Sequence, residues 1–258
     1  MGYRLIFLGT GTADNEERCQ SAYAVVDPTG SFLLVDTGSG LETLKQIVRA
    51  GLEPTRLDKI FLTHRHLDHS AGLLPLLLWV RLRYPEIPAR ITIHGSAETV
   101  HAMEEMHRLS GHRSQFQFLE VAPETGVTKW NECTVEAIAA QHITGSLGYR
   151  VRLPGCVLVF SGDTAPSEAV VIAAHKADIL IHESSFDRTQ EAKAADLRHT
   201  TAEQAGALAR RAGVKRLILT HLVPDSLICS ARLRMEAEEA FGGPVDLARD
   251  LWSVDLPG

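Results

Sequence analysis

Cysteine is scarce in this chain of 258 residues, and its scarcity argues against a fold held together by disulfide bonds. Four cysteines are spread widely and form no Cys-x-x-Cys pair: Cys19, Cys133, Cys156 and Cys229. This usage predicts free, buried thiols in a reducing compartment. Because 45% of the residues are hydrophobic, a large core is available without covalent cross-links.

Long hydrophobic runs are missing as well. The first apolar run, Leu5–Leu8, ends at a glycine turn and is too short for a signal peptide or a membrane span. Linkers and low-complexity tracts are also absent from the sequence. We therefore expect a cytoplasmic protein without membrane contact, folded as one domain over residues 1–258.

Dense blocks of lysine and arginine are the third absence. The formal net charge is -6, and the nearest approach to a basic patch, residues 210–216, is interpreted as a solvated helix face. Nucleic-acid-binding proteins usually present a basic surface. The charge therefore argues against structured RNA as a partner.

Short apolar runs alternate with helical patterns along the chain, which predicts an α/β fold with some antiparallel pairing. Residues 21–26 and 31–35 form a predicted hairpin, because the Asp27–Gly30 segment between them is a strong turn sequence. Near the end of the chain, Val245–Leu256 is expected to add an edge strand.

Two helical segments have different apolar patterns. Leu41–Ala50 repeats its apolar residues at the spacing of one buried face: Leu41, Leu44, Ile47 and Val48. Leu73–Arg83 is apolar nearly all round, so it is either deeply buried or part of a contact surface. The second alternative would make the protein a homodimer.

Three histidines and a carboxylate lie within six residues, directly after the predicted buried strand Lys59–Leu62. His64 and His66 are two residues apart, so both rings can point the same way from an extended loop. Asp68 and His69 follow one turn later and can serve a second ion. Imidazole and carboxylate groups are ligands of zinc and similar divalent ions. We therefore interpret the loop as a metal site and not as a solvated histidine-rich loop.

These four residues form a His-x-His-x-Asp-His signature that resembles that of the metallo-β-lactamase superfamily, most closely its ribonuclease Z and arylsulfatase-like phosphodiesterase branch. Further motifs of that branch follow in the same order over nearly the whole chain: Leu8–Thr12, Leu34–Gly38, His142, Phe160–Thr164, His182–Ser185, His199–Thr201 and Leu219–His221. Four histidines match no ligand motif and are interpreted as ordinary surface or capping residues: His94, His101, His107 and His112.

The resemblance implies a four-layer αββα sandwich and a dinuclear metal-dependent hydrolase. It implies that His64, His66 and His142 hold one ion, that Asp68, His69 and His221 hold the other, and that Asp163 bridges them. Zinc is the expected metal, although Mn²⁺ and Fe also suit such donors. A metal-bridged hydroxide would attack the substrate, and Asp68 would also orient that hydroxide.

The resemblance assigns three more residues to the site. His199 would contact the phosphate and protonate the leaving oxygen, with Glu183 beside it to orient and charge the imidazole. Alternatively, His199 is only a residue near a helix N-cap, and Glu183 makes only a structural hydrogen bond. Asp36 would support the metal loop from behind, or else cap the helix at residues 41–50.

One departure from the ribonuclease Z pattern bears on the substrate. Ribonuclease Z enzymes carry a long arm that grips tRNA between the counterparts of His142 and Asp163. Here the segment between them is short enough for only a compact hairpin across Pro154–Gly155. The sequence therefore favours a phosphodiesterase acting on small phosphodiesters or nucleotides.

Three alternatives stay open. The protein could be an arylsulfatase- or lactonase-type hydrolase of another small ester, such as an aryl sulfate, a lactone or a thioester. The substrate expected first is a small-molecule anionic ester. The protein could instead be a ribonuclease Z-like tRNA 3′ endonuclease. It could finally be a metal-binding scaffold without turnover, but all seven ligand positions carry competent residues, which disfavours this alternative.

Overall fold

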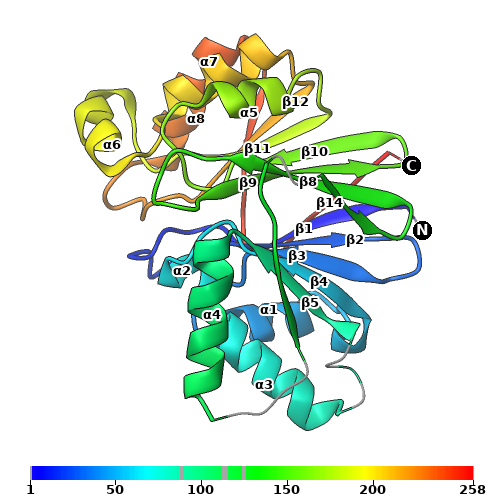
Figure 1. Ribbon diagram of the computed structural model, residues 1–258. Coiled ribbons are helices and arrows are strands. Elements are labelled where there is room, and N and C mark those ends of the chain that lie inside the picture. Colours follow the sequence, from blue (N-terminus) through cyan, green and yellow to red (C-terminus); the bar gives the residue numbers. More distant parts are fainter. Residues whose placement is uncertain (1, 86, 88–89, 112–115, 124–125, 258) are drawn as a thin grey trace.

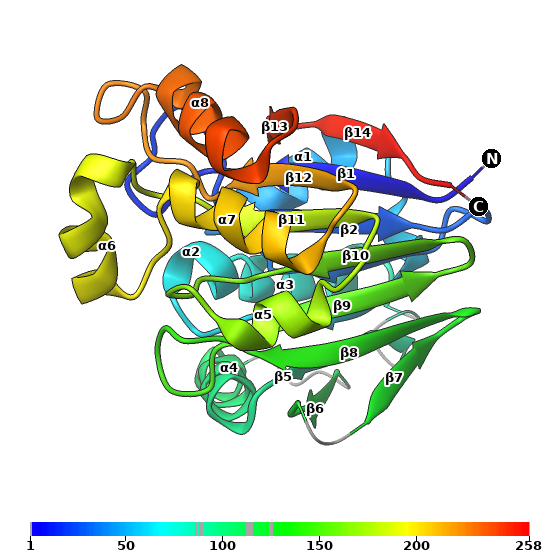
Figure 2. The same cartoon turned by 90° about the horizontal axis from the view of Figure 1, so that it is seen from above.

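The computed structural model contains two mixed β-sheets that pack face to face, with helices on both outer faces (Figure 1). It describes residues 2–85, 87, 90–111, 116–123 and 126–257. Figure 2 shows the same layers from above, with the two chain termini close together at one end. The expected four-layer αββα sandwich is therefore confirmed.

Each sheet combines antiparallel and parallel strands. The first sheet has the spatial order β14 (Trp252–Asp255), β1 (Arg4–Gly9), β2 (Ala22–Val26), β3 (Phe32–Val35), β4 (Leu57–Phe61), β5 (Thr92–Gly95) and β6 (Gln117–Glu120). The second has the order β13 (Val245–Leu247), β12 (Arg216–Thr220), β11 (Ile179–Glu183), β10 (Cys156–Phe160), β9 (Leu147–Leu153), β8 (Cys133–Ala139) and β7 (Val127–Trp130). Strands β3 to β6 are parallel, and so are β10 to β13, so each sheet gathers several strand ends at one edge.

Helices cover the sheets in two groups (Figure 1). The first sheet is covered by α1 (Glu42–Arg49), α3 (Leu73–Arg83) and α4 (Ala97–Leu109), and the second by α5 (Glu168–Ala173), α7 (Ala202–Ala212) and α8 (Ser230–Phe241). Shorter elements complete the chain: η1 (Pro54–Arg56), α2 (Leu67–Ser70), η3 (Arg188–Gln190) and α6 (Glu191–Leu197). Among the described residues, no helix combines the length and apolar character that crossing a membrane requires.

The predicted hairpin is present as β2 and β3, which pair antiparallel from Tyr23 opposite Val35 to Val26 opposite Phe32. The C-terminal segment differs from the expectation of one edge strand, because it supplies an edge strand to each sheet. Between β13 and β14 the backbone of Ala248 donates to the Leu219 carbonyl at 2.8 Å. Leu251 then donates to the Phe7 carbonyl at 2.7 Å, so the segment crosses from one sheet to the other.

The central apolar core lies between the two sheets and is rich in aromatic rings from both of them. Two buried tyrosines also join the sheets by hydrogen bonds. The Tyr149 hydroxyl donates to the Leu62 carbonyl at 2.7 Å, and the Tyr23 hydroxyl lies 3.1 Å from Thr220 Oγ1. Leu62 and Thr220 each lie at the end of a strand that leads into the predicted metal site, so these bonds set the position of its two halves.

The expected buried face of α1 is wrong at two positions. Leu41 and Val48 are exposed, whereas Thr43, Gln46 and Ile47 are buried. Thr43 Oγ1 donates to the Thr37 carbonyl at 2.5 Å, and Gln46 Nε2 donates to the Leu8 carbonyl at 3.0 Å. These bonds turn a polar stripe of the helix toward the sheet, where its side chains satisfy one carbonyl of β1 and one of the loop after β3.

Helix α3 is buried on one face only. Its inner face buries Leu73, Leu76, Leu77 and Val80, while Leu82 on its outer side is exposed. The homodimer therefore stays a prediction.

The cysteines are free, as expected, but they are not all buried. Cys133 and Cys156 lie in the core between the sheets. Cys19 is half-buried and Cys229 is exposed, because Cys229 lies at the surface directly before α8. The prediction of buried thiols is therefore wrong for these two residues.

A close backbone approach at Gly72 holds the segment that follows the histidine loop. The Gly72 amide donates to the Gly38 carbonyl at 2.8 Å, and a Cβ at Gly72 would lie 1.9 Å from the Thr37 carbonyl oxygen. A contact of that length forces the backbone to move.

We predict that Gly72→Ala lowers the free energy of unfolding by about 1–3 kcal/mol, the usual cost of overpacking a well-packed site. Gly243→Ala is the matched control, because a Cβ there would lie 3.6 Å from the nearest Phe241 atom. Urea denaturation of both variants measures the difference. Equal midpoints for the two variants would show that the chain accommodates the methyl group.

Candidate metal centre

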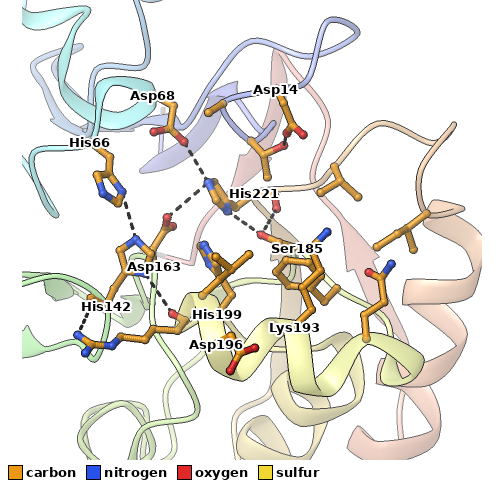
Figure 3. A pocket seen from close by; sticks show the side chains of 18 of the residues that line it. Asp14, His66, Asp68, His142, Asp163, Ser185, Lys193, Asp196, His199 and His221 are labelled. Atoms are coloured by element: carbon orange, nitrogen blue, oxygen red, sulfur yellow. Dashed lines mark hydrogen bonds and ion pairs between the residues drawn. The ribbon is translucent and has the colours of Figure 1, made fainter.

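Side chains from both sheets converge at the edge where the parallel strands end. The loop after β4 and the short helix α2 supply His64, His66, Asp68 and His69. The second sheet and its loops supply His142, Asp163, Glu183, His199 and His221. Figure 3 shows His66, Asp68, His142, Asp163, His199 and His221 grouped around one space. The structure thus brings together every site residue that the sequence predicts.

Two groups of three ligand atoms can each surround an ion. His64, His66 and His142 form one group, in which the ligand atoms lie within 4.8 Å of one another and His66 Nδ1 is 3.1 Å from His142 Nε2. Asp68, His69 and His221 form the other. There, His221 Nε2 lies 3.3 Å from both His69 Nε2 and Asp68 Oδ2.

Asp163 lies between the two groups. Its Oδ2 atom is 3.3 Å from His69 Nε2 and 3.5 Å from His221 Nε2. The same atom is 3.8 Å from His64 Nε2, which belongs to the other group. One carboxylate is therefore placed to serve both groups.

The donors fit zinc or a similar divalent ion. Tetrahedral sites with metal–nitrogen bonds of about 2.0–2.1 Å place neighbouring ligand atoms about 3.3–3.4 Å apart, close to the spacings seen here. His64 Nε2 is buried and has no hydrogen-bond partner among the described residues. A buried imidazole nitrogen in that state needs a partner, and a metal ion supplies one.

The second nitrogen of most of these imidazoles is held by a neighbour, as is usual for metal-binding histidines. His69 Nδ1 lies 2.8 Å from Asp36 Oδ2, and His64 Nδ1 lies 3.0 Å from Thr63 Oγ1. On the other sheet, His142 Nδ1 donates to the Arg198 carbonyl at 3.1 Å, and His221 Nδ1 lies 2.9 Å from Ser185 Oγ. These contacts direct the opposite nitrogens toward the shared space.

Asp36 supports the histidine loop and does not cap a helix. Its Oδ1 accepts a hydrogen bond from the Thr63 amide at 2.7 Å, and its Oδ2 accepts one from Thr63 Oγ1 at 2.8 Å. The residue at the N-cap of α1 is Leu41. Asp36 has a φ of 59° and His221 a φ of 55°, a left-handed conformation that residues with side chains adopt rarely and at some backbone cost.

The electrostatics of the cluster favour a cation. Burial lowers the pKa of His64, His66 and His142, which keeps these imidazoles neutral and able to bind metal. Burial would also lower the pKa of His69, but the carboxylates of Asp163, Asp36 and Asp68 raise it well above its usual value. The negative potential at His69 is the field that a bound cation would neutralise.

His199, which is partly exposed, pairs with the buried Glu183 beside this cluster. His199 Nδ1 lies 2.8 Å from Glu183 Oε1, which also accepts hydrogen bonds from the amides of Thr164 and Thr200. Burial would lower the pKa of His199, but the Glu183 carboxylate and its hydrogen bond raise it to about 9. The N-cap of α7 is Thr201, in a capping box with Gln204, so His199 is not the capping residue.

Three supporting residues were not predicted. Thr63 links Asp36 to the loop, Ser185 holds His221, and Arg198 holds His142 through its carbonyl, while its guanidinium Nη1 donates to the His142 carbonyl at 2.7 Å. Thr63 and Ser185 stand inside or next to the motifs, but the sequence does not show which atoms they contact. No sequence pattern indicated that Arg198 supports the site.

The histidines outside the motifs lie away from the cluster, with one correction. His101 is exposed and pairs with Glu120 at 2.9 Å, and His107 packs near the Phe116 and Phe118 rings. His94 is buried, contrary to the surface or capping role expected, and its ring stacks on Phe61 because β5 lies beside β4. His112 lies outside the described residues.

A pocket of about 630 Å³ opens over the cluster, large enough for a small organic ligand. The cluster contributes His66, Asp68, His142, Asp163, His199 and His221 to its wall. The rest of the wall includes residues of α6, of the loop before α8 and of the loop after β1. The carboxylates, the imidazoles and the pocket together provide a site for metal-assisted hydrolysis.

Comparisons with known proteins agree with this geometry. Residues 32–222 match the family model described as "Beta-lactamase superfamily domain". The chain is 29% identical to the ribonuclease Z of Myxococcus xanthus over an alignment of 316 positions, which covers 98% of each protein. That alignment is longer than this chain, so the relative has residues that this chain lacks.

Two solved structures are similar over the whole fold. The metallo-beta-lactamase fold protein YhfI from Bacillus subtilis superposes with a TM-score of 0.86 at 21% identity, covering 98% of each chain. The short form of human tRNase Z has a TM-score of 0.79 at 26% identity, covering 98% of this chain and 99% of its own. This chain therefore belongs to the beta-lactamase superfamily, as a metal-dependent hydrolase with ribonuclease Z homologues.

Proposed function

We propose that this protein is a phosphodiesterase that cleaves small phosphodiesters, nucleotides among them, with two divalent ions, Zn²⁺ first of all. The observation that carries the proposal is the His199–Glu183 pair, 2.8 Å apart beside the cluster of ligand side chains. An imidazole charged by a buried carboxylate suits a phosphate oxyanion and carries a proton for the leaving oxygen. A lactone or thioester hydrolase needs no such pair.

The seven ligand side chains divide between the two ions. In the proposed site His64, His66 and His142 hold one ion, Asp68, His69 and His221 hold the other, and Asp163 reaches both. Bound divalent ions would polarise the ester and make a nucleophile available from water near pH 7. The Asp68 side chain, partly exposed to the pocket, accepts a hydrogen bond from the attacking water and orients it.

His199 acts at the leaving group. Its Nδ1 faces Glu183, so the remaining nitrogen, Nε2, is the one that can donate a proton to an ester oxygen. Glu183 is almost wholly buried and is fixed by the backbone amides of Thr164 and Thr200, so it orients the ring as well as charging it. Both residues thus stabilise charge that develops as the ester bond breaks.

The shortness of the segment between His142 and Asp163 favours a small substrate. Strands β9 and β10 pair antiparallel from Tyr149 opposite Phe160 to Leu153 opposite Cys156, which leaves a tight turn and no extended arm there. The net charge of -6 also gives little attraction for a polyanion. An aryl sulfate is the nearest alternative among small anionic esters.

A second candidate is cleavage of the tRNA 3′ end, because the chain aligns over nearly its full length with a relative named ribonuclease Z. A grip supplied by a partner subunit would replace the missing arm. The two candidates differ in substrate size and share the same metal chemistry.

We predict two metal ions per chain, measured by elemental analysis of protein purified without chelator. His142→Ala should lower the metal content and abolish hydrolysis, because it removes one donor of the first group. His175→Ala, an exposed histidine after α5, is the matched control and should change neither. Less than one ion per chain after reloading, or full metal content in His142→Ala, would contradict the two-metal site.

We predict that His199→Ala leaves the metal content intact and lowers kcat for a phosphodiester with a poor leaving group by roughly 10²–10⁴-fold, the usual worth of a positioned acid. The loss should shrink when the leaving group is 4-nitrophenolate, which departs without a proton. Glu183→Gln should give a smaller loss of the same kind.

The control for this assignment is the metal content, since His199 also lies within 4.8 Å of His142 and Asp163 ligand atoms. An emptied metal site in His199→Ala would make the residue a ligand. Equal losses with good and poor leaving groups would make it a phosphate-binding donor and not an acid.

We predict that the enzyme cleaves bis(4-nitrophenyl) phosphate much faster than a pre-tRNA 3′ trailer, compared as kcat/KM on the same metal-loaded preparation. The short β9–β10 turn and the acidic chain give the reason. Comparable rates on the two substrates would favour the tRNA candidate.

A further inference from the structure

We infer that the pocket contains an apolar subsite for one uncharged, flat arm of the diester, an aryl or nucleoside group, with Leu197 and Leu227 at its rim. The inference rests on the proposed phosphodiesterase function and names which diesters the site prefers. It uses the part of the pocket that lies outside the ligand cluster and the His199–Glu183 pair.

The apolar wall of this subsite runs from a buried floor to an exposed rim. Phe186, Val223 and Ile228 line the pocket and belong to the core between the second sheet and its helices. Leu197, at the end of α6, and Leu227, in the loop before α8, line the same pocket but are 50% and 63% exposed. A ligand group that covers such exposed leucines gains the free energy of burying apolar surface.

The rim is held in place, so it can select a ligand by shape. The Leu227 amide donates to the Pro224 carbonyl at 2.9 Å, which folds the loop before α8 into a turn. On the other side, the Arg188 amide donates to Glu236 Oε2 at 2.8 Å and fixes the start of the α6 segment to α8. One rim segment therefore continues directly into α8, and the other is hydrogen-bonded to α8 through Arg188.

The charges around the pocket argue for an uncharged arm. Two acidic and two basic side chains line it outside the ligand cluster: Asp14, Asp196, Lys193 and Arg198. Figure 3 shows Asp14, Lys193 and Asp196 around the edge of the ligand cluster. Their formal charges cancel, so outside the ligand cluster a second anionic group on the substrate finds no excess of basic side chains to pair with.

The two basic side chains, Lys193 and Arg198, also contact other groups of the protein. Lys193 Nζ lies 5.4 Å from the centre of the Phe186 ring, a cation–π contact. Arg198 Nη1 donates to the His142 carbonyl at 2.7 Å. A substrate phosphate would compete with these contacts, whereas an apolar arm leaves them intact.

Three diesters that share the 4-nitrophenolate leaving group test the subsite: the methyl, benzyl and 4-carboxybenzyl 4-nitrophenyl phosphates. We expect kcat/KM for the benzyl diester to exceed that for the methyl diester by about tenfold, the gain from partly burying one ring. The 4-carboxybenzyl diester should be a poorer substrate than the benzyl diester. Equal values for benzyl and methyl overturn the subsite, and a preference for the carboxylate overturns the uncharged arm.

Variants of Leu197 and Leu227 test whether these side chains cause the preference for the benzyl diester. Leu197→Ser and Leu227→Ser should each reduce the benzyl-to-methyl ratio, and the double variant should bring it close to one. Ile172→Ser is the matched control, because Ile172 is 68% exposed on α5 and does not line the pocket. An unchanged ratio in the double variant overturns the assignment of the rim.

A binding measurement separates this inference from the proposed function. Calorimetry of the metal-loaded protein should show benzylphosphonate binding about tenfold more tightly than methylphosphonate, and Leu227→Ser should remove the difference. Neither compound is an ester, so turnover is not needed. If none of the three diesters is cleaved, the proposed function fails, and equal binding of the two phosphonates then overturns the subsite independently.

Discussion

The buried carboxylate of Asp36 holds the end of β3, the loop after β4 and the ring of His69 in one arrangement. It accepts two hydrogen bonds from Thr63 and contacts His69 Nδ1, and it is almost fully shielded from water. Burial raises the pKa of Asp36, and the neighbouring His69 and Thr63 oppose that rise. A buried charge is tolerated only with such partners, so the shape of the histidine loop and the ionisation of Asp36 depend on each other.

The cluster also depends on the distance between the two sheets, since each sheet supplies part of it. The Tyr149 hydrogen bond to Leu62 lies next to the histidine loop of the first sheet, and the Tyr23 contact with Thr220 lies next to His221 of the second. Bond lengths to a metal ion tolerate errors of only a few tenths of an ångström. A well-packed aromatic core between the sheets is therefore a requirement of the site and not only a source of stability.

The histidine loop after β4 was predictable from the residues themselves, because three imidazoles and a carboxylate follow a buried strand directly. His142, Asp163 and His221 were assigned only through the resemblance to the metallo-β-lactamase superfamily. The β2–β3 hairpin was predictable from the residues too, since its turn is local. The buried face of α1 was not, because Thr43 and Gln46 bond to carbonyls that only the folded chain brings near. The same holds for Arg198, whose contact with His142 joins segments far apart in the sequence.

The crossing of the C-terminal segment from β13 to β14 has a consequence for biosynthesis. Strand β1 pairs on one side with β2, which follows it closely in the sequence, and on the other with β14, which is synthesised much later. Strand β12, which leads to His221, likewise has one unpaired edge until β13 is synthesised. A nascent chain therefore keeps an open strand edge in each sheet until β13 and β14 have been synthesised, and chaperones that shield such edges have their greatest effect in that interval.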